Sequence, residues 1–197
     1  MNRAQIIHPL WLRATHWINA LAVVVMVMSG WKIYNASPIF PFTFPNEITL
    51  GGWLGGALLW HLFAMWILMA NGLIYLSLNL ATNRLKSKFF PISPRALLLD
   101  LFDAIKGKLA HTDLSHYNQP QKLAYLFIII DIILLVMSGL AIWKSVQLPL
   151  LRELMGGYDN ARIVHFVAMS ALVAVVAVHL IMVALVPRTL LLMIRGR

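Results

Sequence analysis

The sequence predicts an all-α integral membrane protein, a four-transmembrane-helix bundle with a cytoplasmic amphipathic surface helix. Two observations predict this fold class. Of the 197 residues, 60% are hydrophobic and only 12% are charged, a composition too apolar for a soluble globular domain. Four hydrophobic runs are each long enough to cross a bilayer as one helix. We therefore expect a single membrane domain over residues 1–197.

The hydrophobic runs set the approximate limits of the membrane-spanning helices. These helices are expected over about 10–33, 52–78, 122–143 and 161–187. Tryptophans near the ends of the first run suit the membrane–water interface. After this run, Pro38, Pro41 and Pro45 exclude a regular helix.

The connection between the second and third spans carries the surface helix. Ser93 and Pro94 resemble an N-cap and a first helical residue. The following stretch, 94–109, is amphipathic but too polar to span, so we expect it to lie on the membrane surface.

The distribution of Lys and Arg predicts the orientation. Twelve of the 16 lie in the N-terminus, the 79–122 connection and the C-terminal tail, and four lie in the two opposite connections. Both termini are therefore expected in the cytoplasm of a multi-pass membrane protein. Because the basic residues flank hydrophobic runs, the net charge of +9 reflects contact with the lipid bilayer, and no nucleic acid partner is expected.

Four of the seven histidines fall within predicted spans, although ionisable groups there are costly and call for a function. His165 and His179 are fourteen residues apart in the last span, which is ~21 Å of helix rise and nearly four whole turns. By depth, His16 pairs with His179 and His61 pairs with His165. Each pair joins two helices at one level, as axial ligation of a haem requires.

The sequence therefore predicts two non-covalent, bis-histidine haem b groups with these four histidines as iron ligands. The chain has no cysteine, which excludes thioether-linked haem and iron–sulfur clusters. A single membrane histidine is more often a hydrogen-bonded packing residue, but four at matched depths favour ligation. Transition-metal transport is a weaker alternative because no carboxylate or thiol set accompanies the histidines.

Two arginines each precede a histidine by three residues, so each pair shares a helix face. Arg13 precedes His16 and Arg162 precedes His165. Arginine pairs well with carboxylates such as haem propionates. Ordinary interfacial placement of a long basic side chain is the alternative.

The segment Arg13-Ala-Thr-His16-Trp17-Ile-Asn-Ala20 resembles the R-x-x-H-W-x-x-A opening of bacterial b-type cytochrome subunits. These subunits serve hydrogenase, formate dehydrogenase and thiosulfate reductase, within the cytochrome b561 group. The resemblance covers nearly the whole chain, and the histidine spacing in the last helix is its most specific part. It implies an electron-transfer subunit of an oxidoreductase complex that connects membrane quinone with a periplasmic redox protein.

The resemblance also implies a quinone or quinol pocket on the cytoplasmic side, near the start of the third span. Side chains suited to quinone carbonyls occur there: Tyr117, Asn118, Gln121 and Lys122. Pro120 departs from the usual pattern of the family. No catalytic residue is assigned. The periplasmic partner is expected to be a hydrogenase, a molybdenum enzyme or a cytochrome, and homo-oligomerisation is left open.

Asp131 is an acidic residue within an apolar span. It lies about three turns into the third span, where it could relay protons to quinone or form a structural hydrogen bond.

Two functions other than an electron-transfer subunit are left open. The chain could be a self-contained quinone-linked oxidase or reductase of a small periplasmic molecule. A haem-free membrane scaffold or transporter is a further alternative.

Overall fold

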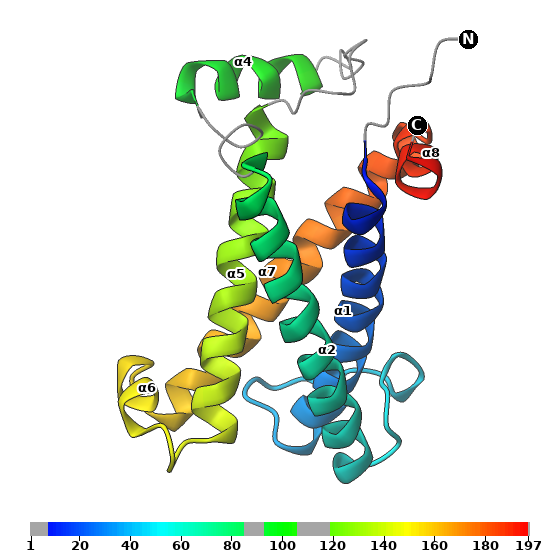
Figure 1. Ribbon diagram of the computed structural model, residues 1–197. Coiled ribbons are helices and arrows are strands. Elements are labelled where there is room, and N and C mark those ends of the chain that lie inside the picture. The colour runs from blue at the N-terminus through cyan, green and yellow to red at the C-terminus, as the bar shows by residue number, and fades with distance from the viewer. Residues whose placement is uncertain (1–7, 85–92, 106–118, 197) are drawn as a thin grey trace, which may run out of the picture. The chain divides into compact units, whose positions relative to one another are not determined.

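The computed structural model describes residues 8–84, 93–105 and 119–196, and within this part the long elements are all α-helices (Figure 1). They are α1 (Leu10–Ala36), α2 (Leu54–Ala81), α4 (Pro94–Ile105), α5 (Gln119–Trp143), α6 (Pro149–Leu154), α7 (Tyr158–Leu185) and α8 (Arg188–Arg195), with a short 3-10 helix, η1 (Asn46–Ile48). Four of these, α1, α2, α5 and α7, are long and apolar enough to cross a membrane. The predicted fold class is confirmed.

The helix limits differ from the predicted ones by a few residues. α5 begins at Gln119, because Pro120 falls in the first turn, where its missing N–H has no helical partner to lose. The surface helix α4 begins at Pro94 as expected and is described to Ile105. The predicted continuation, 106–109, lies outside the described residues.

The chain folds into two compact units. The first comprises Met1–Leu78 and Leu180–Arg197, and the second comprises Asn79–His179. The single membrane domain stays a prediction.

In the first unit, polar side chains join α1 and α2 at two levels. The buried Asn71 donates from Nδ2 to Thr15 O at 2.7 Å and to Asn19 Oδ1 at 2.6 Å. Ten residues earlier on α2, His61 Nδ1 lies 3.1 Å from Met26 O. The two levels are therefore ~15 Å apart along α2. Because a hydrogen bond between membrane helices contributes only about 0.6 kcal/mol on average, these contacts fix the register of α1 and α2 more than they stabilise the pair.

The two ends of the described chain meet in the same unit (Figure 1). Arg13 Nη1 donates to Ile194 O at 2.6 Å, Trp17 Nε1 donates to Met193 O at 3.4 Å, and the backbone N–H of His8 donates to Gly196 O at 3.4 Å. These contacts satisfy carbonyls at the C-terminal end of α8, which otherwise lack partners. The start of α1 and the end of α8 therefore lie side by side in the first unit.

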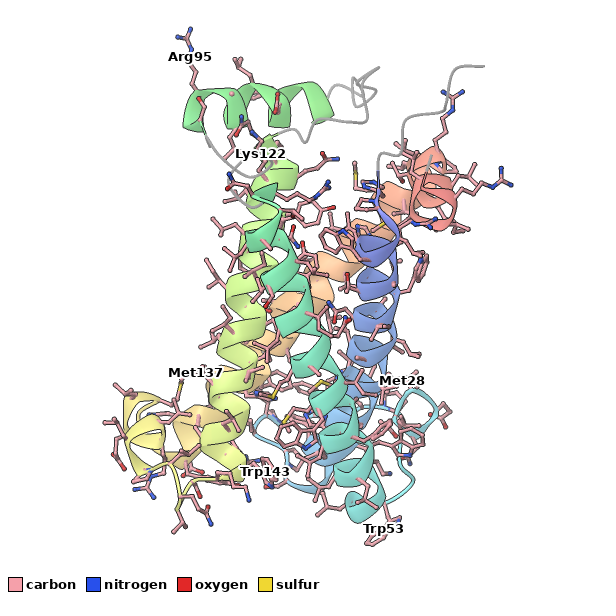
Figure 2. The ribbon with its side chains drawn as sticks, in the orientation of Figure 1. Met28, Trp53, Arg95, Lys122, Met137 and Trp143 are labelled. Carbon is pink, nitrogen blue, oxygen red and sulfur yellow. The ribbon has the colours of Figure 1, made fainter. Side chains whose placement is uncertain are left out.

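In the second unit, α4 contacts the start of α5 and α6 contacts its end (Figure 1). Asp100 on α4 accepts a 2.9 Å hydrogen bond through Oδ2 from the backbone N–H of Gln119. A carboxylate at that position satisfies an amide at the helix N-terminus and favours its positive dipole end. Figure 2 shows Lys122 at this end of α5 and Trp143 at the other. Trp143 is an exposed aromatic suited to a membrane interface.

An aromatic cluster follows α1, in the loop whose prolines were expected to exclude a regular helix. Trp31 stacks on Phe44 with ring centroids 4.7 Å apart. The side chain of Asn35 exchanges two hydrogen bonds with the Phe44 backbone, at 2.7 and 2.8 Å. Phe40 and Phe42 remain exposed. The loop is thus an ordered aromatic surface, which we call the aromatic loop (37–45).

Candidate haem-ligand site

His61, the eighth residue of α2, lies against the last third of α1. Its Nδ1 is 3.1 Å from Ser29 Oγ and 3.1 Å from Met26 O. Ser29 is fully buried and directs its one hydroxyl proton to carbonyls of its own helix, Val25 O at 2.6 Å and Met26 O at 3.2 Å. Toward His61 the serine oxygen therefore acts as an acceptor.

These contacts determine the tautomer of His61. A carbonyl oxygen only accepts, and the serine proton is already used, so both neighbours of Nδ1 require an N–H there. A neutral imidazole protonated at Nδ1 keeps its lone pair on Nε2. His61 thus has the form that binds a metal through Nε2 while its other nitrogen is held by the protein.

His165 repeats this arrangement in the second unit. It is the eighth residue of α7, and its Nδ1 is 2.9 Å from Oγ of the fully buried Ser138 on α5. Ser138 also directs its proton into its own helix, to Leu134 O at 2.7 Å and Leu135 O at 3.2 Å. Because that proton is used within α5, Ser138 Oγ accepts from Nδ1–H of His165, and the lone pair of this ring lies on Nε2.

A glycine follows each serine and makes room for the imidazole ring. A Cβ added to Gly30 would lie 3.4 Å from His61 Cε1, and one added to Gly139 would lie 3.2 Å from His165 Cε1. Small residues let a neighbouring group approach the backbone closely. The structure places an imidazole against each glycine.

The other two histidines lie at a second level of their own helices. His16 is thirteen residues before Ser29 on α1, and His179 is fourteen residues after His165 on α7. At ~1.5 Å per residue each unit therefore has two histidine levels separated by ~20 Å. His16 is partly buried, with its ring 5.5 Å from that of Trp17, and His179 is exposed. The pairing of His16 with His179 and of His61 with His165 stays a prediction.

The two predicted propionate partners have different surroundings. Arg13 uses Nη1 for the contact with Ile194 O, and its buried Nε has no hydrogen-bond partner among the described residues. Arg162 is partly buried near the start of α7. A propionate role for either arginine stays a prediction.

The predicted quinone residues are only partly covered by the structure. Tyr117 and Asn118 lie outside the described residues. Gln121 is exposed and Lys122 is partly buried in the first turn of α5. Their role toward quinone stays a prediction.

Asp131 is buried in the middle of α5, with 5% of its surface exposed. Its Oδ2 has no hydrogen-bond partner in the part of the chain that the structure describes. A buried carboxyl oxygen without a partner is costly. Proton relay and a structural role through the other oxygen both stay predictions.

Ser29, Ser138 and Asn71 were not identified as functional residues from the sequence. Both serines stand in a repeated Val-Met-Ser-Gly segment, at 27–30 and 136–139. The signal available was a hydroxyl at the predicted depth of a histidine on the neighbouring helix. Asn71 had no comparable pattern.

Comparison with known proteins now adds to this geometry. A family model described as prokaryotic cytochrome b561 matches residues 7–196. The chain belongs to this family. It is therefore a multi-pass b-type cytochrome that binds haem and takes part in transmembrane electron transfer, which confirms the resemblance found in the sequence.

One similar protein covers nearly the whole chain. It is named "Putative protein-methionine-sulfoxide reductase subunit YedZ1", from Azospira oryzae, and is 67% identical over 190 residues, 96% of each chain. No solved structure matches.

The described residues fit a haem b. Two buried serines hold His61 and His165 in the form that carries its lone pair on Nε2, and a histidine with a fixed second nitrogen is the usual ligand of haem iron. The fourteen-residue spacing of His165 and His179 leaves ~21 Å between their levels on α7.

Proposed function

We propose that this chain carries electrons across the bacterial inner membrane between quinol and a periplasmic oxidoreductase, using two haem b groups. The observation that carries the proposal is the matched state of His61 and His165, each donating from Nδ1 to a buried serine and so carrying its lone pair on Nε2. A histidine that served only to pack two helices would not need the same tautomer in both units.

The four histidines are assigned as two pairs. His61 and His165 would hold the haem nearer the periplasm, and His16 and His179 would hold the haem nearer the cytoplasm. A bound haem b supplies one-electron Fe(III)/Fe(II) chemistry. The support is the ~20 Å spacing of the two histidine levels within each unit, together with membership of the family.

The two arginines are proposed to bind haem propionates. Arg13, three residues from His16, keeps its buried Nε available after the contact with Ile194 O. Arg162, three residues from His165, is partly buried. A guanidinium offers several N–H donors in a planar fork that suits a carboxylate.

Quinol oxidation is proposed on the cytoplasmic side. Tyr117, Asn118, Gln121 and Lys122 supply hydrogen-bonding groups for the quinone carbonyls, and Asp131 would carry a proton if it acts as a relay. Oxidation of one quinol releases two protons and two electrons. The contacts between the start of α1 and the end of α8, combined with the excess of Lys and Arg at both ends and in the 79–122 connection, support cytoplasmic termini.

The periplasmic partner is proposed to be a reductase of methionine sulfoxide in proteins, because the relative from Azospira oryzae is named as a subunit of such an enzyme. Reduction of one sulfoxide to the thioether consumes two electrons and two protons and releases one water, which balances the oxidation of one quinol. The exposed Phe40 and Phe42 of the aromatic loop offer the partner an apolar contact of the kind enriched in interfaces.

The test uses the purified full chain in lipid nanodiscs with a water-soluble quinol. Quinol is expected to produce the reduced absorbance band of low-spin haem b. The band should persist when methionine sulfoxide is added alone, and disappear when a purified periplasmic sulfoxide reductase is added with it. The variant His179→Ala should slow reduction by quinol, because it removes a ligand on the quinol side.

Two results would contradict this proposal in different ways. Reoxidation by methionine sulfoxide without a partner would identify a self-contained enzyme. A preparation without any reducible haem would overturn the electron-transfer role and leave the scaffold or transporter alternative.

A further inference from the structure

The chain contains two copies of one helix-pair arrangement. In the first copy, Ser29 on α1 contacts His61 on α2, and in the second, Ser138 on α5 contacts His165 on α7. Each histidine is the eighth residue of its helix, and each serine follows Met in a Val-Met-Ser-Gly segment. Figure 2 marks Met28 on α1 and Met137 on α5, the residues directly before the two serines.

Burial follows the same pattern in both copies. Buried residues stand four positions before, three after and seven after each histidine, and their types match: Ala57, Ala64 and Leu68 around His61, and Ala161, Ala168 and Leu172 around His165. Seven positions before each serine, Ala22 and Asp131 are also buried. The serine–histidine contact is therefore a retained part of a duplicated packing unit.

The second histidine level does not share this duplication. Thirteen residues before the serine, the first copy has His16 and the second has Tyr125. Fourteen residues after the histidine of α2 or α7, the first copy has Tyr75 and the second has His179. The duplicated serine thus accompanies only the histidines assigned to the periplasmic haem.

We infer that Ser29 and Ser138 are paired positioning residues that set the reduction potential of the haem nearer the periplasm. The inference rests on the proposed function, in which His61 and His165 are ligands of that haem. The hydroxyl of each serine donates its proton to a carbonyl of its own helix. Its oxygen can therefore only accept a hydrogen bond from Nδ1–H of the histidine. A hydrogen bond accepted from Nδ1–H raises the basicity of the imidazole, and a more basic ligand favours Fe(III) over Fe(II). The serines therefore lower the potential.

The test compares Ser29→Ala, Ser138→Ala and the double variant with the unchanged chain. Ser170→Ala is the matched control, because Ser170 on α7 also donates to the carbonyl four residues earlier, Phe166 O at 2.9 Å, but is exposed. Each alanine removes one oxygen from a fully buried site, so the fold is expected to survive. The readouts are a redox titration of the haem absorbance bands and the electron paramagnetic resonance spectrum of the low-spin haems.

One of the two midpoint potentials is expected to move to a more positive value in both single variants and further in the double variant. The other potential should stay unchanged, and Ser170→Ala should change neither. The resonance positions of the shifted haem should also move, because each variant removes an acceptor of Nδ1–H. In Ser29→Ala, Met26 O still accepts from His61. If the double variant does not retain the haem, the midpoint potentials of the two single variants, measured by the same titration, test the inference.

An unchanged pair of potentials in serine variants that retain both haems would overturn the inference about the serines. It would leave the proposed function intact, provided that His61→Ala and His165→Ala still affect one and the same haem. If these histidine variants affect different haems, the ligand assignment fails, whatever the serine variants do.

Discussion

Replacing His61 or His165 by alanine is expected to abolish the low-spin signal of the same haem and to leave the other haem in place. Alanine has no donor atom for iron, and in both positions a buried serine would keep a lone pair without its Nδ1–H partner. His16→Ala and His179→Ala should abolish the other haem. The four variants therefore fall into two classes, measured by haem content and redox titration.

The control for this series is His8→Ala, since His8 precedes α1 and its described backbone contact with Gly196 does not need the ring. It should keep both haems. The pairing is wrong if the midpoint potential that remains in His61→Ala differs from the one that remains in His165→Ala. If both histidines bind one haem, removing either of them must leave the same second haem.

The second large effect is expected from Gly139→Val. A Cβ at this position would already lie 3.2 Å from His165 Cε1, closer than ordinary carbon contacts of about 3.5–4.0 Å. The two further methyl groups of valine would displace the ring from Ser138. The variant should lose the low-spin form of the haem held by His61 and His165, as measured by its absorbance and resonance spectra.

Two other glycines give a milder variant and a control for Gly139→Val. Gly30→Ala should be milder, because its Cβ would lie 3.4 Å from His61 Cε1. Gly72→Val, inside α2, should leave both haems unchanged, because among the described residues no atom beyond the adjoining backbone of α2 lies within 4 Å of its added Cβ. If Gly139→Val keeps both low-spin haems at their original potentials, then the close approach of ring and backbone has no role in holding His165.

The long helices could be predicted because membrane spans depend on a property that is local in the sequence. A continuous apolar run needs no knowledge of its neighbours, so α1, α2, α5 and α7 were found within a few residues of their limits. The proline-rich break after α1 and the start of α4 at Pro94 were likewise predicted from local chemistry.

The short helices were not predicted, because their length gives little periodicity. α8 has only eight residues, and isolated helices of that length are unstable in water. Its last carbonyls accept hydrogen bonds from Arg13 and Trp17, which come from the opposite end of the chain. No local pattern around 188–195 indicates those partners.

The histidines of the candidate site could be found from the sequence, but their surroundings could not. Ionisable residues inside apolar runs are conspicuous, and their depth follows from counting. The tautomer of His61 depends on which faces of α1 and α2 pack together, and on the hydrogen bond that the Ser29 hydroxyl donates to Val25 O. That packing is tertiary information, so the tautomer became accessible only with the structure.

The most direct test of the central claim is the ratio of haem b to chain in the purified protein, combined with its resonance spectrum. We predict two haem b groups per chain, both low-spin with two histidine ligands. A ratio of one, or a high-spin signal from a haem that does not require both His61 and His165, would contradict the assignment of four histidines to two irons.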